Sequence, residues 1–399
     1  MVVNLSISLL NNPSAVFSPG QTVQACVKFH STIPNRVKGV YAKFKGESHT
    51  SWSTGSGDNK QSHSQTEQYF KTEIPLFQAA EGADGNYVEM DPGNYDFPVN
   101  FVLPPLLPSS FEGGTGYVRY LIKAKVKIKG GTVYRVQHPF TVIYMLDLNT
   151  IPEARMPTQM QDTKTGCCWC CETGPVTCMI RLDKQGYVPG ESIFINAEVT
   201  NNGTSSIRNT NISLRMTTEF RAHGSTTKHH KVISTISHPA VGPGHSDVWS
   251  GEQLAVLPTP PSYLYGCSII DIQYTCQLAA DMEGSLMDIN FDLPIIIGTI
   301  PLRPEGLFQS PAPFQPGQPL ETTWGSNPDQ QPGNIPMNNM ASAQPITSQP
   351  PYPADAPPSY EECMTTDRVR IMRQNSNSAD TEDHFTNFTP SYPYYKQKS

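Results

Sequence analysis

The chain has 399 residues, of which 37% are hydrophobic and 16% are charged, and its formal net charge is −7. This length leaves room for two domains and an additional segment. The net negative charge and the lack of a long basic block argue against electrostatic capture of nucleic acid, so we expect no nucleic-acid partner. No stretch of the sequence reaches the roughly 18 apolar residues that a membrane-spanning helix needs.

The first residues, "MVVNLSISLLNNPS", contain neither a basic leader nor an uninterrupted apolar core, so we expect no secretory signal. We therefore expect a cytoplasmic protein whose association with membranes is peripheral only. In that compartment its nine cysteines are expected to be thiols rather than a disulfide framework.

A weak internal repeat is the most informative feature of the first three quarters of the chain. The stretches "VFSPGQTVQACVKF" (16–29) and "GYVPGESIFINAEV" (186–199) both place an aromatic residue before Pro-Gly and then alternate apolar and polar residues. Pro-Gly favours a turn, and the alternation has the period of a half-buried strand. Further along, "VRYLIKAKV" (118–126) matches "IQYTCQLAA" (272–280). Landmarks that recur in the same order predict two tandem domains of one fold.

Short runs rich in Val, Ile, Thr, Tyr and Phe follow one another through both halves, separated by clusters of Gly, Pro, Asn and Ser. Clear examples of alternation are "GVYAKFKGE", "YVRYLIKAKVKIKGG" and "NISLRMTTEF". This spacing is typical of antiparallel β-sandwiches. We expect an all-β chain with one sandwich over residues 1–148, a linker with a cysteine cluster over 149–172, and a second sandwich over 173–300.

The composition changes after residue 300, since 17 of the 37 prolines fall in the last 99 residues beside many Gln, Asn and Ser. Such a segment buries too little apolar surface to offset its conformational entropy. We expect residues 301–399 to form a disordered, proline-rich tail whose function depends on short linear motifs.

Pro357, Pro358 and Tyr360 form a P-P-x-Y motif within this tail. Two consecutive prolines favour a polyproline II helix with three residues per turn, so Tyr360 returns to the side occupied by Pro357. WW domains bind this arrangement in an aromatic groove. A chance match in a tail rich in proline and tyrosine is the alternative interpretation.

Two weaker candidates lie nearer the end of the tail. In "TPSYPYY", Pro390 and Tyr392 are in place for a second motif, but a threonine stands where its first proline belongs. Upstream, Ser376 follows Arg373 by three residues and Ser378 precedes acidic residues, so both serines are candidate phosphorylation sites. An ordinary polar tail explains these serines equally well.

Four cysteines surround a tryptophan in "CCWCC", namely Cys167, Cys168, Cys170 and Cys171. A zinc site would require a second ligand pair at a matching spacing, and a redox site would require a following helix. Neither is present, so we expect no metal. Reversible palmitoylation of these cysteines is an alternative.

Several stretches together resemble the α-arrestins, which are the arrestin domain-containing proteins. They occur in the family's order, and they are "PGNYDFPVNFVLPPLLPSSFEGGTGYVRYLIKAKV", "CCWCCETGPV", "GYVPGESI", "GCSIIDIQY" and "FDLPIIIGTIPL". The resemblance implies two arrestin-type, immunoglobulin-like sandwiches and, because the family has cysteines around a tryptophan at this point, a structural role for the "CCWCC" cluster. It also implies an adaptor that links cytosolic segments of membrane receptors or transporters to WW-domain HECT-type E3 ubiquitin ligases. Cargo ubiquitination would then promote endocytosis and endosomal sorting, with the protein recruited from the cytoplasm to the plasma membrane and endosomes.

Some α-arrestins bind thioredoxin through a cysteine that lies shortly before a W-x-G sequence. The matching stretch here is "PGHSDVWSG", in which Ser246 occupies that position. A serine cannot form the mixed disulfide, so we expect no thioredoxin coupling of that kind.

Enzyme motifs are incomplete throughout the chain, and we expect neither catalysis nor a cofactor. "GGTG" lacks the Gly-Lys-Ser/Thr of a phosphate loop, and "GHSDV" lacks the second glycine of a nucleophile elbow. Two alternatives to the ligase adaptor remain. One is an endosomal coat or retrieval scaffold in which the tail motif is incidental, and the other is a thiol-based redox regulator centred on the cysteine cluster.

Overall fold

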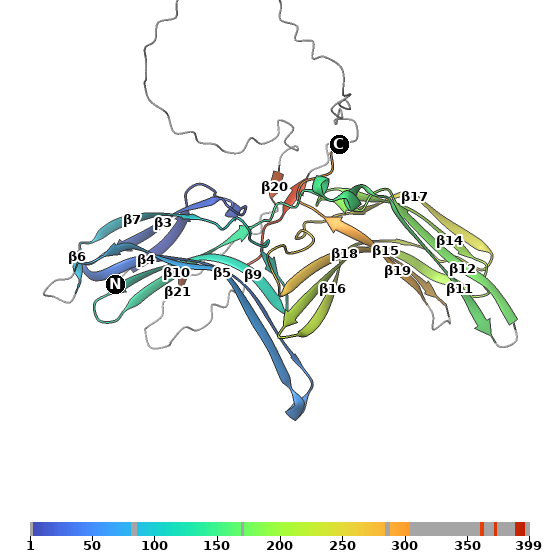
Figure 1. Ribbon diagram of the computed structural model, residues 1–399, viewed down its shortest axis with the longest axis horizontal. Helices are drawn as coiled ribbons and strands as arrows, with labels where there is room; N and C mark the ends of the chain where they lie inside the picture. Colours follow the sequence, from blue (N-terminus) through green and yellow to red (C-terminus); the bar gives the residue numbers. More distant parts are fainter. Residues whose placement is uncertain are drawn as a thin grey trace, which may run out of the picture. The chain divides into compact units, whose positions relative to one another are not determined.

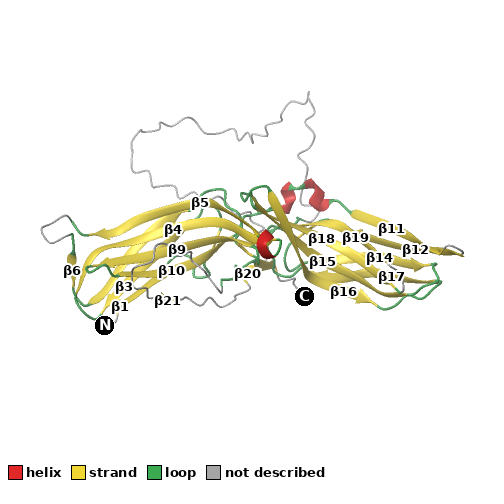
Figure 2. Ribbon diagram, turned by 90° about the horizontal axis from the view of Figure 1, so that it is seen from below, coloured by secondary structure: helices red, strands yellow, loops and turns green. Residues whose placement is uncertain are grey.

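The computed structural model describes residues 3–80, 86–168, 171–283, 288–303, 360–362, 371–372 and 388–395. Of residues 166–168, 171–173, 360–362 and 371–372 it describes the backbone alone. Regular structure in these ranges consists of strands and short 3-10 helices (Figure 2). No helix in them is long and apolar enough to cross a bilayer.

Two antiparallel layers form the first sandwich (Figure 1). Its strands are β1 (Val3–Leu9), β2 (Val16–Phe17), β3 (Thr22–Ser31), β4 (Asn35–Thr54), β5 (Gln61–Gln78), β6 (Val88–Met90), β7 (Gly93–Val102), β8 (Phe111–Glu112), β9 (Gly116–Ile128) and β10 (Val133–Val142). One sheet has the order β1-β3-β7, and the other has the order β2-β10-β9-β4-β5. The rings of Phe44 on β4 and Phe101 on β7 stack between the sheets with centroids 4.6 Å apart.

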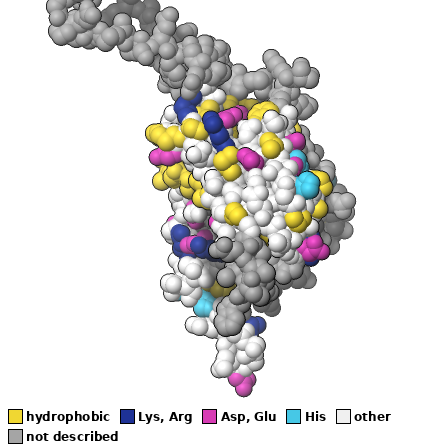
Figure 3. All heavy atoms as spheres, turned by 90° about the vertical axis from the view of Figure 1, so that its right-hand side faces the viewer, with side chains coloured by type: hydrophobic (Ala, Val, Ile, Leu, Met, Phe, Trp, Pro, Cys, Tyr) yellow, Lys and Arg dark blue, Asp and Glu magenta, His cyan; other side chains and the backbone are white. Residues whose placement is uncertain are grey.

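The second sandwich repeats this plan. Its strands are β11 (Thr158–Cys168), β12 (Cys171–Leu182), β13 (Gly186–Tyr187), β14 (Ser192–Asn201), β15 (Ile207–Ala222), β16 (Ser225–His238), β17 (His245–Ala255), β18 (Ile270–Met282) and β19 (Ile289–Ile297). The sheet β11-β12-β14-β17 packs on β13-β19-β18-β15-β16. Burial alternates along β15, as expected for a strand with one face in the core. On the end of the molecule that Figure 3 shows, charged side chains of both signs are interspersed among uncharged ones.

The repeat recognised in the sequence recurs as equivalent hydrogen bonds. In the first sandwich the Tyr120 hydroxyl donates to the Pro108 carbonyl over 2.7 Å, and in the second the Tyr274 hydroxyl donates to the Pro260 carbonyl over 2.7 Å. Each tyrosine is buried in a central strand, where its hydroxyl needs a partner. The prediction of two domains with one all-β fold is therefore confirmed.

The two Pro-Gly turns also have equivalent positions. The amide of Gly20 donates to the Pro104 carbonyl over 3.0 Å, and the amide of Gly190 donates to the Val256 carbonyl over 2.8 Å. Both glycines have positive φ angles of 81° and 99°, which an L-amino acid side chain disfavours. The short strand before each turn pairs in parallel with the last strand of its own sandwich, β2 with β10 and β13 with β19.

Much of the segment that we expected to be a linker belongs to the second sandwich. Residues 149–172 contain part of the 3-10 helix η2 (Leu148–Thr150), the whole of the 3-10 helix η3 (Pro152–Arg155) and all of β11. This strand occupies the edge of its sheet beside β12. Since nearly all of its described side chains are exposed or half-buried, its sequence carries little apolar alternation.

Short pieces of the segment that we expected to be a disordered tail pair with other strands. They are β20 (Tyr360–Glu362), β21 (Ile371–Met372) and β22 (Pro393–Tyr395). Strand β21 pairs with β10, and β20 pairs with β22 in antiparallel register. The described part of the tail therefore includes local structure that its composition did not indicate.

Candidate functional site at the junction of the sandwiches

The segment that leaves the first sandwich pairs with the end of the second. The amide of Leu146 donates to Thr299 Oγ1 over 2.7 Å, and the amide of Thr299 donates to the Leu146 carbonyl over 2.9 Å. Next to this pair, Asp147 and Ile300 form a parallel bridge. These bonds join residues about 150 positions apart, so they hold the segment after the last strand of the first sandwich against the segment after the last strand of the second.

Tyr395 lies against this joint. Its side chain is only 7% exposed and belongs to a small apolar cluster with Leu146, Leu148, Ala154, Val188 and Ile296. The Tyr395 hydroxyl donates to the Thr299 carbonyl over 2.6 Å, and the Tyr395 amide donates to the Pro189 carbonyl over 2.9 Å. Both polar ends of the residue are thus satisfied while its ring is removed from water.

Tyr392 and Ser391 extend the contact to the first sandwich. The Tyr392 hydroxyl donates to the Ser110 carbonyl over 3.0 Å, and the Ser391 amide donates to Thr141 Oγ1 over 3.3 Å. Burial raises the pKa of the Tyr392 phenol well above its ordinary value, so the group remains a neutral donor. Residues 388–395, which we call the docked segment, therefore contact both sandwiches.

The Pro-Gly turn of the second sandwich is shaped for this segment. A methyl group built at Gly190 would overlap the backbone carbonyl of Tyr395, so only glycine allows the observed approach. At the equivalent Gly20, no described atom lies within 4 Å of such a methyl group. The two turns share one conformation, but among the described residues it is the turn of the second sandwich that contacts the docked segment.

The docked segment also pairs with the strand that contains Tyr360. In the β20–β22 pair, Tyr360 lies opposite Tyr395, and Glu362 lies opposite Pro393. Pro393 and Pro390 are both buried. The backbone of Tyr360, the last residue of the P-P-x-Y motif, therefore lies beside the segment that contains Pro390 and Tyr392.

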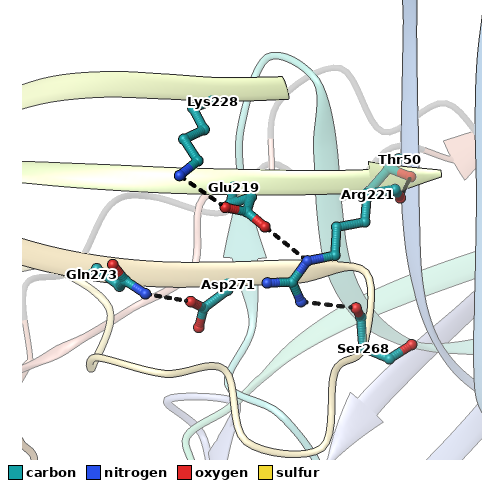
Figure 4. A network of polar contacts seen from close by, with 7 residues as sticks. All are labelled: Thr50, Glu219, Arg221, Lys228, Ser268, Asp271 and Gln273. Carbon is teal, nitrogen blue, oxygen red and sulfur yellow. Dashed lines mark hydrogen bonds and ion pairs between the residues drawn. The ribbon is translucent and has the colours of Figure 1, made fainter. Parts of the chain in front are cut away.

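A polar network lies on the second sandwich near β4 of the first (Figure 4). The guanidinium of Arg221 donates to Glu219 Oε1 over 2.8 Å, and Lys228 Nζ lies 3.1 Å from Glu219 Oε2. Hydrogen bonds from Lys228 and then from Arg221 lower the pKa of Glu219. Thr50 Oγ1 on β4 donates to the Arg221 carbonyl over 2.8 Å, so the network is tied to the first sandwich.

The remaining sequence-predicted site residues fall in different places. Pro357, Pro358, Ser376 and Ser378 lie outside the described residues. Cys168 and Cys171 face each other across the β11–β12 hairpin as backbone partners. The side chains of Cys167, Cys168 and Cys171 and the whole of Cys170 lie outside the described part of the chain. The roles proposed for these residues and for Pro390 and Tyr392 stay predictions.

Four cysteines have described side chains, and none of the four is in a disulfide: Cys26, Cys178, Cys267 and Cys276. Burial raises the pKa of Cys178 and of Cys276 to about 12. Their thiolates are therefore scarce at neutral pH, which disfavours nucleophilic or redox chemistry at these positions. Within the described ranges no three His, Cys, Asp or Glu residues converge as a metal-ligand set.

Ser246 lies on β17, an edge strand of the second sandwich, and its side chain is exposed. Its hydroxyl donates to Thr200 Oγ1 over 3.1 Å on the neighbouring strand β14. A group at this position is accessible to a partner, but a hydroxyl offers no thiol chemistry.

Sequence reasoning missed Tyr395 as a member of this site. The signal that was available is the density of aromatic residues in "PSYPYY" near the end of a polar tail. Rigid prolines and large rings reduce the entropic cost of docking, so such a cluster is typical of a peptide that binds a surface.

Comparison with known proteins agrees with the two-domain architecture. The family described as Arrestin (or S-antigen), N-terminal domain, matches residues 6–149, and the family described as Arrestin (or S-antigen), C-terminal domain, matches residues 172–302. Arrestin domain-containing protein 17 of Caenorhabditis elegans is 29% identical over 76% of this chain and 72% of its own length.

Arrestin domain-containing protein 4 of Homo sapiens is 24% identical over 90% of this chain and 86% of its own length. The human thioredoxin-interacting protein is 29% identical over 73% of each chain. Two matched arrestin domains in tandem, together with these relatives, show that the chain belongs to the arrestin family, in its α-arrestin or arrestin domain-containing branch.

Proposed function

We propose that this α-arrestin is a non-enzymatic adaptor that brings WW-domain HECT-type E3 ubiquitin ligases to membrane-protein cargo. The chain makes and breaks no covalent bond in this function. It raises the concentration of the ligase near cargo lysines, so its contribution is one of proximity. Ubiquitinated cargo is then sorted by endocytosis and through endosomes, and the protein moves between the cytoplasm and those membranes.

The observation that carries the proposal is the P-P-x-Y motif at Pro357, Pro358 and Tyr360, which follows two arrestin sandwiches. The polyproline II conformation of such a motif is recognised by WW domains. A tail with this motif connects a ligase to whatever the sandwiches bind.

The sandwiches offer edge strands for cargo. Strands β5 and β17 each end a sheet, and β17 exposes Val248. An extended cytosolic segment of a receptor or transporter can add to such an edge through backbone hydrogen bonds, while its side chains select the register. We propose that cargo binds the sandwiches in this way.

Calorimetric titration of the full chain with HECT-ligase WW domains tests the ligase link. We expect a dissociation constant in the low-micromolar to tens-of-micromolar range, about −6 to −8 kcal/mol. The variant Tyr360→Ala should lose this binding. Tyr352→Ala is the matched control, because Tyr352 follows Pro350 and Pro351 one position too early to reach the tyrosine pocket.

The outcomes separate the candidate functions. Binding that survives Tyr360→Ala would move the ligase site elsewhere in the tail. No binding by the wild type would contradict the ligase adaptor and favour a coat or retrieval scaffold built on the same sandwiches. A redox regulator would instead require a reactive thiol in the "CCWCC" cluster, which alkylation followed by mass spectrometry would detect.

A further inference from the structure

The strongest unassigned feature is the pair of surfaces that receives the docked segment. The carbonyls of Ser110, Pro189 and Thr299 each accept one hydrogen bond from residues 392–395, and Thr141 Oγ1 accepts one from Ser391. Two of these acceptors belong to the first sandwich, and the other two belong to the second and its final turn. The segment therefore binds a composite site that exists only when both sandwiches are correctly joined.

The chemistry of the segment fits this site. Pro390 and Pro393 are buried and have restricted backbones, so ordering the segment costs less entropy than it would for a flexible peptide. Tyr392 and Tyr395 each place a ring in the site and a hydroxyl on a backbone carbonyl. A ligand for the site is thus a peptide in which tyrosines alternate with prolines.

The residues that dock are also those that define the second tyrosine motif. A WW domain requires the ring and hydroxyl of the motif tyrosine in its own pocket. The Tyr392 hydroxyl is occupied by Ser110, and Pro390 is buried. In the docked conformation, the second motif therefore cannot bind a WW domain.

The first motif is affected through backbone pairing. Tyr360 lies opposite Tyr395 in the β20–β22 pair. A strand that forms ladder hydrogen bonds cannot present the same residue freely to a WW groove, because the groove encloses the peptide.

We propose that the junction of the sandwiches is a binding site for the chain's own Pro390–Tyr395 peptide, and that its occupancy limits the access of WW domains to both tyrosine motifs. The peptide site at the junction is supported by the contacts above, and the effect on WW-domain access rests on the proposed ligase function. If the peptide is docked in about nine molecules of ten, the apparent affinity for a WW domain is about tenfold weaker than that of the released tail.

Gly190→Ala and Gly20→Ala provide a matched pair of full-length variants. Both place a methyl group on a turn with positive φ, so both strain the backbone in a similar way. Only the methyl group at position 190 collides with Tyr395. A difference between the two variants therefore reports the docked segment rather than the turn.

Hydrogen–deuterium exchange measures docking without any ligase. In the wild type, the amides of Ser391, Tyr392, Tyr394 and Tyr395 should exchange at least about tenfold more slowly than in Tyr395→Ala or Gly190→Ala, while Gly20→Ala should match the wild type. Exchange of these amides at the rate of a free peptide in the wild type would overturn the proposal. So would protection that disappears on dilution, because the partner would then be a second copy of the chain.

Titration with a HECT-ligase WW domain measures how much docking weakens the affinity for that domain. Gly190→Ala and Tyr395→Ala should bind about three- to tenfold more tightly than the wild type and Gly20→Ala. If all four proteins bind the WW domain with equal affinity while hydrogen–deuterium exchange shows that the wild-type segment is docked, docking does not limit the access of WW domains and that part of the proposal is overturned. If no protein binds, the proposed ligase function fails, and exchange alone decides whether the junction is a peptide site.

Discussion

The hydroxyl of Tyr395 donates a 2.6 Å hydrogen bond to the backbone carbonyl of Thr299, which lies 96 residues earlier in the chain. Thr299 in turn bonds to Leu146 at the exit of the first sandwich. The phenol of Tyr395 thus adds one hydrogen bond to the Leu146–Thr299 pairing that connects the two domains.

Replacing Tyr395 with Phe tests the energetic value of this bond. The ring stays in its apolar cluster, but the Thr299 carbonyl loses a donor, so we expect a loss of about 1 kcal/mol in stability. For sandwiches of this size, that loss lowers the melting temperature by about 2–4 °C in scanning calorimetry. Tyr394→Phe is the control, because Tyr394 is only half-buried and should leave the melting temperature unchanged. Identical melting of the two variants would argue against the bond.

Glu219 should make stability depend on pH in acid. Its pKa is lowered by Lys228 and Arg221, so its carboxylate is a better partner in the folded than in the unfolded state. Its contribution is present above the unfolded pKa, near 4.3, and is lost as the pH falls through the lower folded pKa.

The variant Glu219→Gln should therefore melt below the wild type at pH 7, and the difference should shrink as the pH falls below the unfolded pKa. Since the group is partly exposed, the difference at pH 7 should stay below about 1 kcal/mol. Melting curves between pH 7 and pH 3 provide the measurement. Glu89→Gln, at an exposed position on β6, should show no such trend. A difference in melting temperature that does not shrink between pH 7 and pH 3 would assign the effect to packing rather than to charge.

Cys178 and Cys276 should resist thiol reagents in the folded protein. Each is buried, and burial raises its pKa to about 12, so alkylation at pH 7.5 should be slower than that of a model thiol by about a thousandfold or more. Iodoacetamide labelling followed by mass spectrometry, with and without denaturant, measures the rates. Rapid labelling of the native protein would show that the second sandwich opens locally.

The exposed hydroxyl at Ser246 should leave the wild type without a mixed disulfide to thioredoxin at this position. A trapping thioredoxin, in which the resolving cysteine is removed, should form no covalent adduct through residue 246 on a non-reducing gel. Ser246→Cys tests whether the surrounding strand accepts thioredoxin when a thiol is supplied. An adduct in the wild type would point to another cysteine, which peptide mapping would identify.

The two sandwiches could be predicted because their determinants are local. Alternation along residues 118–126 and 272–280 and the Pro-Gly turns fix strand and turn positions within a few neighbours. Strand β11 could not be predicted in this way, since an edge strand with exposed side chains has little apolar pattern.

The docking of Tyr395 depends on distant partners. Its ring packs on Leu146 and Val188, and neither the composition nor the period of the tail indicates that these residues are near. The P-P-x-Y motif at Pro357 could be proposed from its spacing, because a linear motif needs no tertiary context, but it stays a prediction since Pro357 lies outside the described residues.

The parallel pairing of a short early strand with the final strand, β2 with β10 and β13 with β19, has a topological consequence. Each sandwich pairs its own early strand with its own final strand, so a second sandwich can follow the first in one chain without changing the strand order of the first. The turn at Gly190 nevertheless has a neighbour that the turn at Gly20 lacks among the described atoms, so one shared backbone shape has two different surroundings in one chain.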